Sequence, residues 1–258
     1  MTGQVLLATD GPIAMVALSH PGKLNAMSRA MWRALREVFT SLQQRDDLRC
    51  VLVSGEGANF CAGGDITEYP DFRFDEEALR AFHEEEVWGG LQAMLDCDIP
   101  IVAQIGGACM GAGLEIASCC DMRLAGLSAK FGAPIAKLGF PMAPREAALV
   151  MRAAGELTAR EMLLAAAVLD APTMRQRGFL NHVLADAEVA SEAAAMAERV
   201  AGLAQAAARL NKQAFRALAL EDRARAATDL IASAYTYADS AEHREGVAAF
   251  VEKRSPRF

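Results

Sequence analysis

The fold of this chain is indicated by the sequence IGGACMGAGLE, which occupies residues 105–115. An apolar run, residues 100–103, precedes it, and an apolar, helix-compatible stretch comes after it. The small residues let a ligand approach the backbone, and a helix start offers unpaired N–H donors at the positive end of its dipole. Because no Ser, Thr, Asp or Asn stands at the expected cap position, a ligand can use these donors. Glu115 lies within the first turn. Backbone donors beside a carboxylate suit chemistry that builds negative charge on a carbonyl oxygen.

Length and charge narrow the class of protein. The 258 residues are enough for one large domain, or for one domain with an appendage. The 26 basic and 33 acidic side chains give a net charge of −7, which argues against wholesale nucleic-acid binding. The N-terminal residues lack the pattern of a signal peptide, and no apolar run is long enough to span a bilayer. We therefore expect a soluble cytoplasmic protein.

The cysteines and histidines show no spacing typical of a metal site. The six cysteines lie mostly in apolar context and form no CxxC pair, so we expect reduced thiols in the core. They are Cys50, Cys61, Cys97, Cys109, Cys119 and Cys120. The four histidines are scattered. The sequence thus predicts neither a disulfide framework nor a bound metal.

Strands and helices alternate through the first two thirds of the chain. Asp10 and Gly11 favour a hairpin turn between two apolar runs. The remaining pattern predicts helices over residues 28–42 and 76–95 and strands over residues 50–53, 101–105 and 122–125. Thr158 and Glu161 form a capping-box pattern that predicts a helix start there. Such alternation indicates an α/β architecture with crossover connections.

The C-terminal part of the chain differs in character. From about Asp186 onward, alanine-rich segments flanked by charges succeed one another to Arg254 without a strong strand signal. This composition predicts helices. We accordingly divide the chain into a core, residues 1–185, and a helical region, residues 186–258. These helices are either a surface layer over the core or an oligomerisation region, and the sequence alone leaves both open.

A second glycine-rich segment, FCAGGDI, occupies residues 60–66 after the strand at 50–53. Its paired glycines allow a positive φ or a close backbone approach, and Asp65 can cap a helix that begins directly after it. Taken alone, the segment is typical of a tight turn that enters a helix. Two glycine-rich turns that each come after a strand can instead direct two N–H groups at one oxygen, which is what an oxyanion hole requires.

Five short motifs together resemble the crotonase, or enoyl-CoA hydratase/isomerase, superfamily. They occur in the family's order over nearly the whole chain and are HPGKLNAMS at 20–28, FCAGGDI at 60–66, GACMGAGLE at 107–115, FGAP at 131–134 and GVAAFVEKRSP at 246–256. The resemblance implies an α/β fold, namely a spiral of ββα units with a helical trimerisation region after it. It also implies a homotrimer or a dimer of trimers.

The resemblance implies a binding site for acyl-CoA thioesters, as in fatty acid metabolism, and stabilisation of a thioester enolate. The oxyanion donors would be the backbone N–H groups of Gly64 and Ala112, and Glu115 would be the acid/base. The residues expected along coenzyme A are Lys23, Leu24, Ala26, Ala62, Asp65, Ile66, Phe250 and Lys253, the last two contributed by a neighbouring subunit. No metal or other cofactor is implied, because coenzyme A arrives with the substrate. The simpler interpretations are a surface lysine for Lys23 and a glutamate that satisfies helix-start donors for Glu115.

One position departs from the family pattern. Typical hydratases carry a second glutamate immediately after the proline of the FGAP-like motif, where this chain has Ile135, and Met142 stands where some relatives have an aspartate. A hydration reaction would therefore lack one of its usual catalytic carboxyl groups. We favour a hydratase or isomerase that uses Glu115. The alternatives are a CoA-thioester hydrolase or decarboxylase, or an acyl-CoA-binding subunit with reduced catalysis. Possible substitutes for the missing carboxyl are Glu84, Glu85, Glu86 and Glu146, the first three being more typical of a solvated cluster. The sequence does not indicate the identity of the acyl chain.

Overall fold

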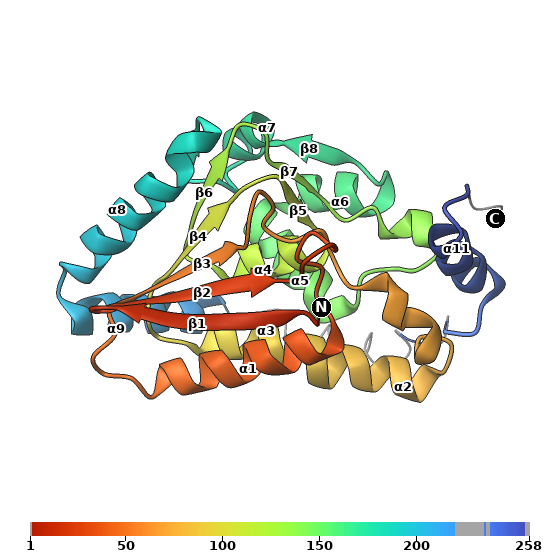
Figure 1. Cartoon of the computed structure of the whole chain (residues 1–258), viewed down its shortest axis with the longest axis horizontal. Coiled ribbons are helices and arrows are strands. Elements are labelled where there is room, and N and C mark those ends of the chain that lie inside the picture. The colour runs from red at the N-terminus through yellow and green to blue at the C-terminus, as the bar shows by residue number, and fades with distance from the viewer. Residues whose placement is uncertain (1, 220–234, 236–237, 256–258) are drawn as a thin grey trace.

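A computed structural model describes residues 2–219, 235 and 238–255 of the chain (Figure 1). The strands are β1 Gln4–Asp10, β2 Ile13–Ser19, β3 Cys50–Gly55, β4 Ile101–Ile105, β5 Ala108–Met110, β6 Met122–Gly126, β7 Lys130–Gly132, β8 Val168–Asp170 and β9 His182–Leu184. The α-helices are α1 Arg29–Gln43, α2 Glu76–Ala81, α3 Trp88–Asp96, α4 Ala112–Cys119, α5 Pro144–Ala154, α6 Glu156–Leu164, α7 Ala171–Gln176, α8 Val189–Ala201, α9 Gln205–Ala219 and α11 Ala241–Val251. Shorter helical segments are η1 Ile66–Asp71, η2 Phe82–Val87, η3 Ile135–Leu138 and η4 Asp186–Glu188.

Two sheets organise the part of the chain that the structure describes. The larger one has six strands in the order β1-β2-β3-β4-β6-β9, and the smaller one has three in the order β5-β7-β8. From β2 to β9 all neighbours in the larger sheet are parallel, so each connection crosses over, as the alternation of strands and helices predicts. The chain passes from one sheet to the other between β4 and β5, where Gly107 has a φ of +48°. The glycine-rich segment thus lies where the two sheets meet.

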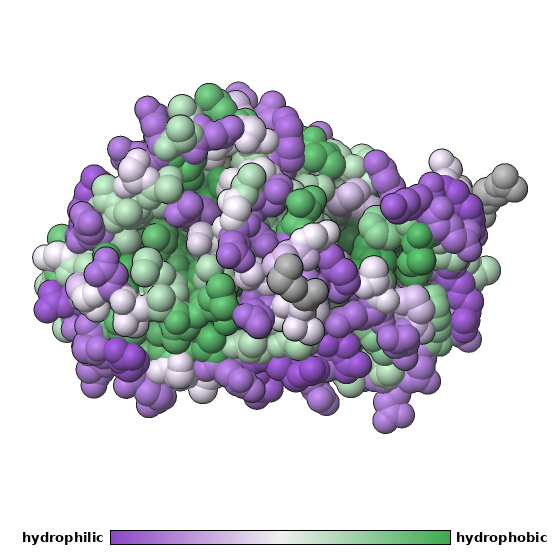
Figure 2. All heavy atoms as spheres, in the orientation of Figure 1, coloured by the Kyte–Doolittle hydropathy of each residue, from purple (hydrophilic) through white to green (hydrophobic). Residues whose placement is uncertain are grey.

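The N-terminal elements agree with the prediction. β1 and β2 pair antiparallel around Gly11, whose φ of +53° suits the tight turn. The helix α1 begins after Ser28, whose side chain accepts a hydrogen bond from the N–H of Met31 at 3.2 Å. Figure 2 shows apolar side chains gathered over β1 and β2, where Leu6, Leu7 and Met15 are partly exposed.

The predicted helix at 76–95 is helical throughout but not uniform. It consists of α2, the π-helical segment η2 and α3. A π-helix accommodates an extra residue in its turn and changes the direction of the side chains beyond it. Here η2 buries His83, whereas α3 buries Leu91 and Met94 in the main core.

The predicted start of a helix at Thr158 is wrong. α6 begins at Glu156, its N-cap is Gly155 with a φ of +86°, and Thr158 is a buried residue inside the helix. The left-handed turn at Gly155 separates α5 from α6 and sets where α6 begins. The Thr158 side chain packs in the interior and does not cap.

The described C-terminal segments are helical. α8 packs across β3, β4 and β6, where Ala193 and Ala197 cover Val102. Two ion pairs fasten α9 to the core, Lys212 Nζ to Asp121 at 2.8 Å and Arg216 to Asp98 at 2.8 Å. The predicted helical tail also covers residues 220–234, which lie outside the described residues, as does Pro256 of the last motif. The domain boundary near residue 186 and the oligomerisation role stay predictions.

The buried thiols agree with the sequence-based prediction. All six cysteines are buried and free. Within the part of the chain that the structure describes, no group of three or more His, Cys, Asp or Glu side chains is arranged to hold a metal ion. No helix among the described residues is both long enough and apolar enough to cross a bilayer.

Candidate functional site

The two glycine-rich segments lie side by side and are held together by backbone hydrogen bonds. The N–H of Phe60 donates to the carbonyl of Gly106, that of Cys61 to Ala108, and that of Met110 to Cys61, each at 2.8–2.9 Å. This parallel pairing continues the sheet for a few residues beyond β3 and β4. It brings the ends of both segments to one place, as the sequence predicts.

The backbone N–H groups of Gly64 and Ala112 take no part in this pairing. Met27 bonds to the residues on either side of Gly64, accepting from the N–H of Asp65 and donating to the carbonyl of Gly63, both at 2.8 Å. Ala112 opens α4, whose N-cap Gly111 offers no side-chain cap. Neither N–H donates a hydrogen bond to any of the residues that the structure describes. Gly64 and Ala112 both line a cavity of about 60 Å³.

Close packing fixes the spacing of these two groups. A Cβ atom added at Gly113 would lie 2.5 Å from the carbonyl oxygen of Cys61, and one added at Gly64 would lie 2.3 Å from the hydroxyl of Tyr69. Either contact is far inside the normal van der Waals separation. Glycine at 113 therefore allows α4 to approach the Phe60–Gly64 segment.

Glu115 lies on the first turn of α4 and lines the same cavity, with 6% of its surface exposed. Burial raises the pKa of its carboxyl well above the ordinary value, and the nearby charge of Glu146 raises it further. Arg73 opposes this shift. Among the described residues, no backbone N–H donates a hydrogen bond to the Glu115 carboxyl. This argues against the interpretation of Glu115 as a residue that satisfies helix-start donors.

A second buried carboxyl, Glu146, lies in the cavity and belongs to the first turn of α5. It is 3% exposed, and its Oε1 is 2.7 Å from Nδ1 of His83. Burial raises the pKa of Glu146 to about 8, while Arg73 lowers it. Of the four possible substitutes for the missing glutamate, Glu146 lines this cavity. The sequence offered no motif that would single it out.

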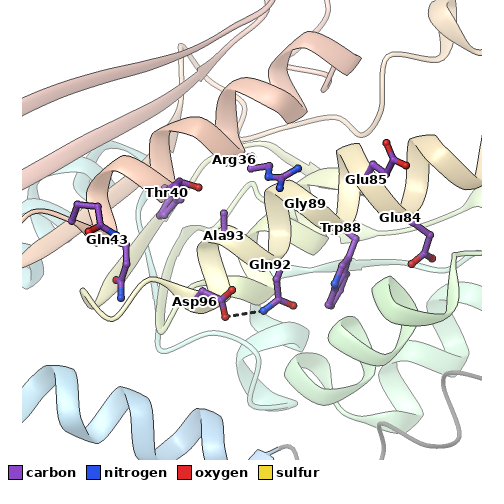
Figure 3. Close-up of a pocket in the computed structure, with 12 residues that line it drawn as sticks. Arg36, Thr40, Gln43, Glu84, Glu85, Trp88, Gly89, Gln92, Ala93 and Asp96 are labelled. Atoms are coloured by element: carbon purple, nitrogen blue, oxygen red, sulfur yellow. Dashed lines mark hydrogen bonds between the residues drawn. The ribbon is translucent and has the colours of Figure 1, made fainter.

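The other three glutamates have different surroundings. Glu86 pairs with Arg29 at 2.6 Å and Arg33 at 3.0 Å. Glu84 and Glu85 line a separate, more open groove of about 570 Å³ between α1 and α3 (Figure 3). Trp88 and Gln92 of α3 border this groove, and no residue expected in the oxyanion hole, as the acid/base or along coenzyme A lines it. The groove is therefore distinct from the cavity that holds Glu115.

Arg73 is the positive charge of the cavity, and only 1% of its surface is exposed. Its guanidinium carbon lies 4.4 Å from the ring centre of Tyr69 and 4.0 Å from that of Phe140. Its Nη1 is 3.2 Å from Nε2 of His83, and its Nε donates to Nε2 of His243 at 3.4 Å. A guanidinium can only donate hydrogen bonds, so both imidazoles accept through Nε2 and carry their proton on Nδ1. Nothing in the sequence pattern pointed to Arg73.

Both histidines are neutral. Burial lowers the pKa of His83 well below its ordinary value, and the charge of Arg73 lowers it further. Burial also lowers the pKa of His243 to about 4, and its Nδ1–H donates to the carbonyl of Ala238 at 2.9 Å. His83 therefore donates its Nδ1–H to Glu146 as a neutral imidazole.

The N-terminal residues expected along coenzyme A form one connected cluster. Lys23 Nζ contacts Asp65 at 2.6 Å and Thr67 Oγ1 at 2.8 Å, so it is not an isolated surface lysine. Burial raises the pKa of Asp65, but hydrogen bonds from Lys23 and Thr67 outweigh this and lower it overall. The N–H of Ala62 donates to the carbonyl of Leu24 at 3.0 Å, and Leu24 has a φ of +48°. Asp65 also caps η1, directly before Ile66, as the sequence predicts. Ala26 lies on the same loop and is buried.

The two C-terminal candidates lie elsewhere. Phe250 is 53% exposed on α11, and Lys253 comes just after that helix with a φ of +55°. Among the described residues, neither has a hydrogen bond or ion pair with the Lys23–Asp65 cluster. Their expected contribution to a neighbouring subunit's site stays a prediction.

Known proteins resemble the chain over nearly its full length. A family model described as enoyl-CoA hydratase/isomerase matches residues 8–258. A Mycobacterium bovis protein named "Probable enoyl-CoA hydratase" is 30% identical over 257 residues, covering 98% of this chain and 97% of that protein. A crystal structure of an enoyl-CoA hydratase/carnithine racemase from Magnetospirillum magneticum has a TM-score of 0.82 and 35% identity, covering 100% of this chain and 96% of the other. An enoyl-CoA hydratase/isomerase from Pseudoalteromonas atlantica has a TM-score of 0.83 and 29% identity, with 99% of both chains covered. These structures confirm the expected crotonase-like fold.

Proposed function

The chain belongs to the enoyl-CoA hydratase/isomerase family, and from that premise we propose that it binds an acyl-CoA and stabilises its thioester enolate. The thioester oxygen accepts hydrogen bonds from the N–H groups of Gly64 and Ala112. Glu115 transfers a proton to or from the α-carbon. The observation that carries this proposal is the cavity itself. It is lined by two backbone segments with unpaired N–H donors and by a buried carboxyl one turn into α4.

The physical chemistry of enolate formation suits this arrangement. An α-proton of a thioester is very weakly acidic, so its removal near neutral pH needs both a base and stabilisation of the oxyanion. Loss of one preorganised donor typically costs about 3 kcal/mol in the transition state, so a pair supplies several kcal/mol. The raised pKa of Glu115 brings its proton affinity closer to that of a carbon acid's enolate. The reaction we favour is hydration or double-bond isomerisation of an enoyl-CoA.

Binding is the first expected result. Calorimetric titration with acetyl-CoA and butyryl-CoA should give a saturable heat without added metal or redox cofactor, because the thioester and the backbone donors supply the recognition. Lys23→Ala should weaken binding, since it removes the contact to Asp65 at the proposed coenzyme A cluster. Absence of heat and of competition at millimolar acyl-CoA contradicts the proposal.

Assembly is the second expected result. Large apolar side chains are exposed on the C-terminal helices, including Leu210, Phe215 and Phe250 at 53–71%. Large apolar side chains left exposed on helices are covered when a neighbouring subunit packs against them. We therefore expect a homotrimer or a dimer of trimers in which Phe250 and Lys253 meet a neighbouring copy. Light scattering at micromolar concentration measures the mass, and a monomer contradicts the assembly.

A further inference from the structure

Hydration and double-bond migration each move two protons at different atoms. Hydration takes a proton from water at the β-carbon and adds one at the α-carbon, and migration removes an α-proton and adds a γ-proton. A single carboxyl can carry out both proton transfers only if it reaches both of these atoms. The cavity that holds Glu115 contains a second buried carboxyl, Glu146, and position 135 is an isoleucine.

We propose that Glu146 is the second acid/base carboxyl of this active site and works with Glu115, the two acting on different atoms of one bound thioester. The assignment rests on the proposed function. Glu115 and Glu146 stand on the first turns of α4 and α5, two helices that pack against each other. Both line the cavity that also contains the proposed oxyanion donors.

Glu146 is held in place by a short chain of hydrogen bonds. Arg73 donates to Nε2 of His83 at 3.2 Å, which leaves the imidazole proton on Nδ1, and that N–H donates to Oε1 of Glu146 at 2.7 Å. A stacked contact with Tyr235, at 5.7 Å between ring centres, fixes the plane of His83. The chain orients the carboxyl without protonating it, because His83 is neutral.

The groups around the cavity determine which of the two carboxyls acts as the acid and which as the base. The groups that face Glu146 are Glu115 from α4, Arg73 after η1, and His83 and Glu84 from η2, with Tyr235 close by. Two carboxyls in one buried site do not ionise together easily, so the pair retains a proton over part of the pH range. Arg73 lowers the pKa of both carboxyls, but only Glu146, of the two, accepts a hydrogen bond from His83, at 2.7 Å. This bond favours ionised Glu146, and the resulting charge favours protonated Glu115. Glu146 is then the base and Glu115 the acid.

The hydration step balances with this division. The Glu146 carboxylate takes a proton from water while the water oxygen bonds to the β-carbon. The C=C electron pair moves toward the thioester carbonyl, whose oxygen becomes the enolate oxygen between Gly64 and Ala112. The Glu115 carboxylic acid then protonates the α-carbon, and the carbonyl re-forms. A proton then passes from Glu146 back to Glu115, which restores the starting protonation of the two carboxyls. The net change is the addition of one water molecule to the substrate.

The test compares Glu146→Gln with the wild type in hydration of crotonyl-CoA and isomerisation of 3-butenoyl-CoA. The amide oxygen still accepts from His83, so the fold is kept, and thermal unfolding and acyl-CoA titration verify this. Turnover should fall by roughly 10²–10⁴-fold with little change in affinity. In the wild type, kcat should rise with pH through about 8 as Glu146 ionises, and this rise should be absent in the variant. Glu156→Gln, at an exposed pair with Arg160, is the matched control.

A rescue variant separates lost chemistry from lost structure. Adding Ile135→Glu to Glu146→Gln places a carboxyl on another wall of the same cavity and should restore part of the activity. Wild-type rates and pH profile in Glu146→Gln, with Glu115→Gln impaired, overturn the role of Glu146 and leave the proposed function intact. A wild type that binds acyl-CoA but converts neither thioester also overturns that role. A protein that binds no acyl-CoA overturns the proposed function itself.

Discussion

Replacing Glu115 by Gln should lower turnover of an enoyl-CoA by roughly 10²–10⁴-fold, the usual worth of a positioned acid or base. The amide keeps the shape and a hydrogen-bonding group but can neither hold nor release the proton. Because Glu115 lies in the cavity and not in the Lys23–Asp65 cluster, acyl-CoA affinity should change little. Steady-state kinetics with crotonyl-CoA and calorimetric titration measure the two quantities separately.

The exposed Glu156→Gln change again serves as the control and should leave kcat and KM at their wild-type values. Strong crotonyl-CoA hydration that survives Glu115→Gln would show that another group performs the proton transfer. It would then contradict the assignment of Glu115, whatever the outcome for Glu146.

Replacing Gly113 by Ala should lower kcat/KM by roughly 10²-fold, because it disturbs one of the two oxyanion donors. The added methyl would lie 2.5 Å from the carbonyl oxygen of Cys61, a backbone atom that has no freedom to rotate away. α4 must then shift from the Phe60–Gly64 segment and carry the Ala112 N–H with it. Kinetics with crotonyl-CoA and thermal unfolding together measure the effect.

The matched control is Gly202→Ala, at the end of α8. There a Cβ would meet its nearest neighbours at 3.5 Å, an ordinary contact, and φ is −77°. Activity should be unchanged. A Gly113→Ala protein with wild-type kcat/KM would mean that the spacing of Gly64 and Ala112 does not govern the reaction.

Local signals predicted the fold well. The Asp10-Gly11 turn and the apolar periodicity of α1 depend on neighbours in sequence, and each appears in the structure. The prediction at Thr158 failed because its capping-box pattern lies inside a helix that already begins after Gly155. Periodicity also could not reveal η2, since a π-turn differs from an α-turn by a single residue.

The residues of the site also differ in whether local sequence signals could predict them. Gly64, Ala112 and Glu115 belong to glycine-rich motifs that come after strands, so the sequence could predict their meeting. Glu146 and His83 meet across 63 residues, and neither belongs to a motif. Arg73 lies on a connection after η1, where a charged residue ordinarily faces solvent. Burial and pairing of that kind depend on the packed tertiary structure.

The π-turn in η2 has a consequence for how the length of this helix is constrained. In an α-helix each residue advances the side-chain direction by about 100°, so deletion of one residue rotates everything beyond it by that angle. α2 and the start of η2 are aligned so that His83 faces Glu146, while α3 is aligned so that Leu91 and Met94 face the core. The extra residue in the turn reconciles these two alignments. A chain shortened by one residue here would gain a regular helix and lose either the contact between His83 and Glu146 or its packed interior.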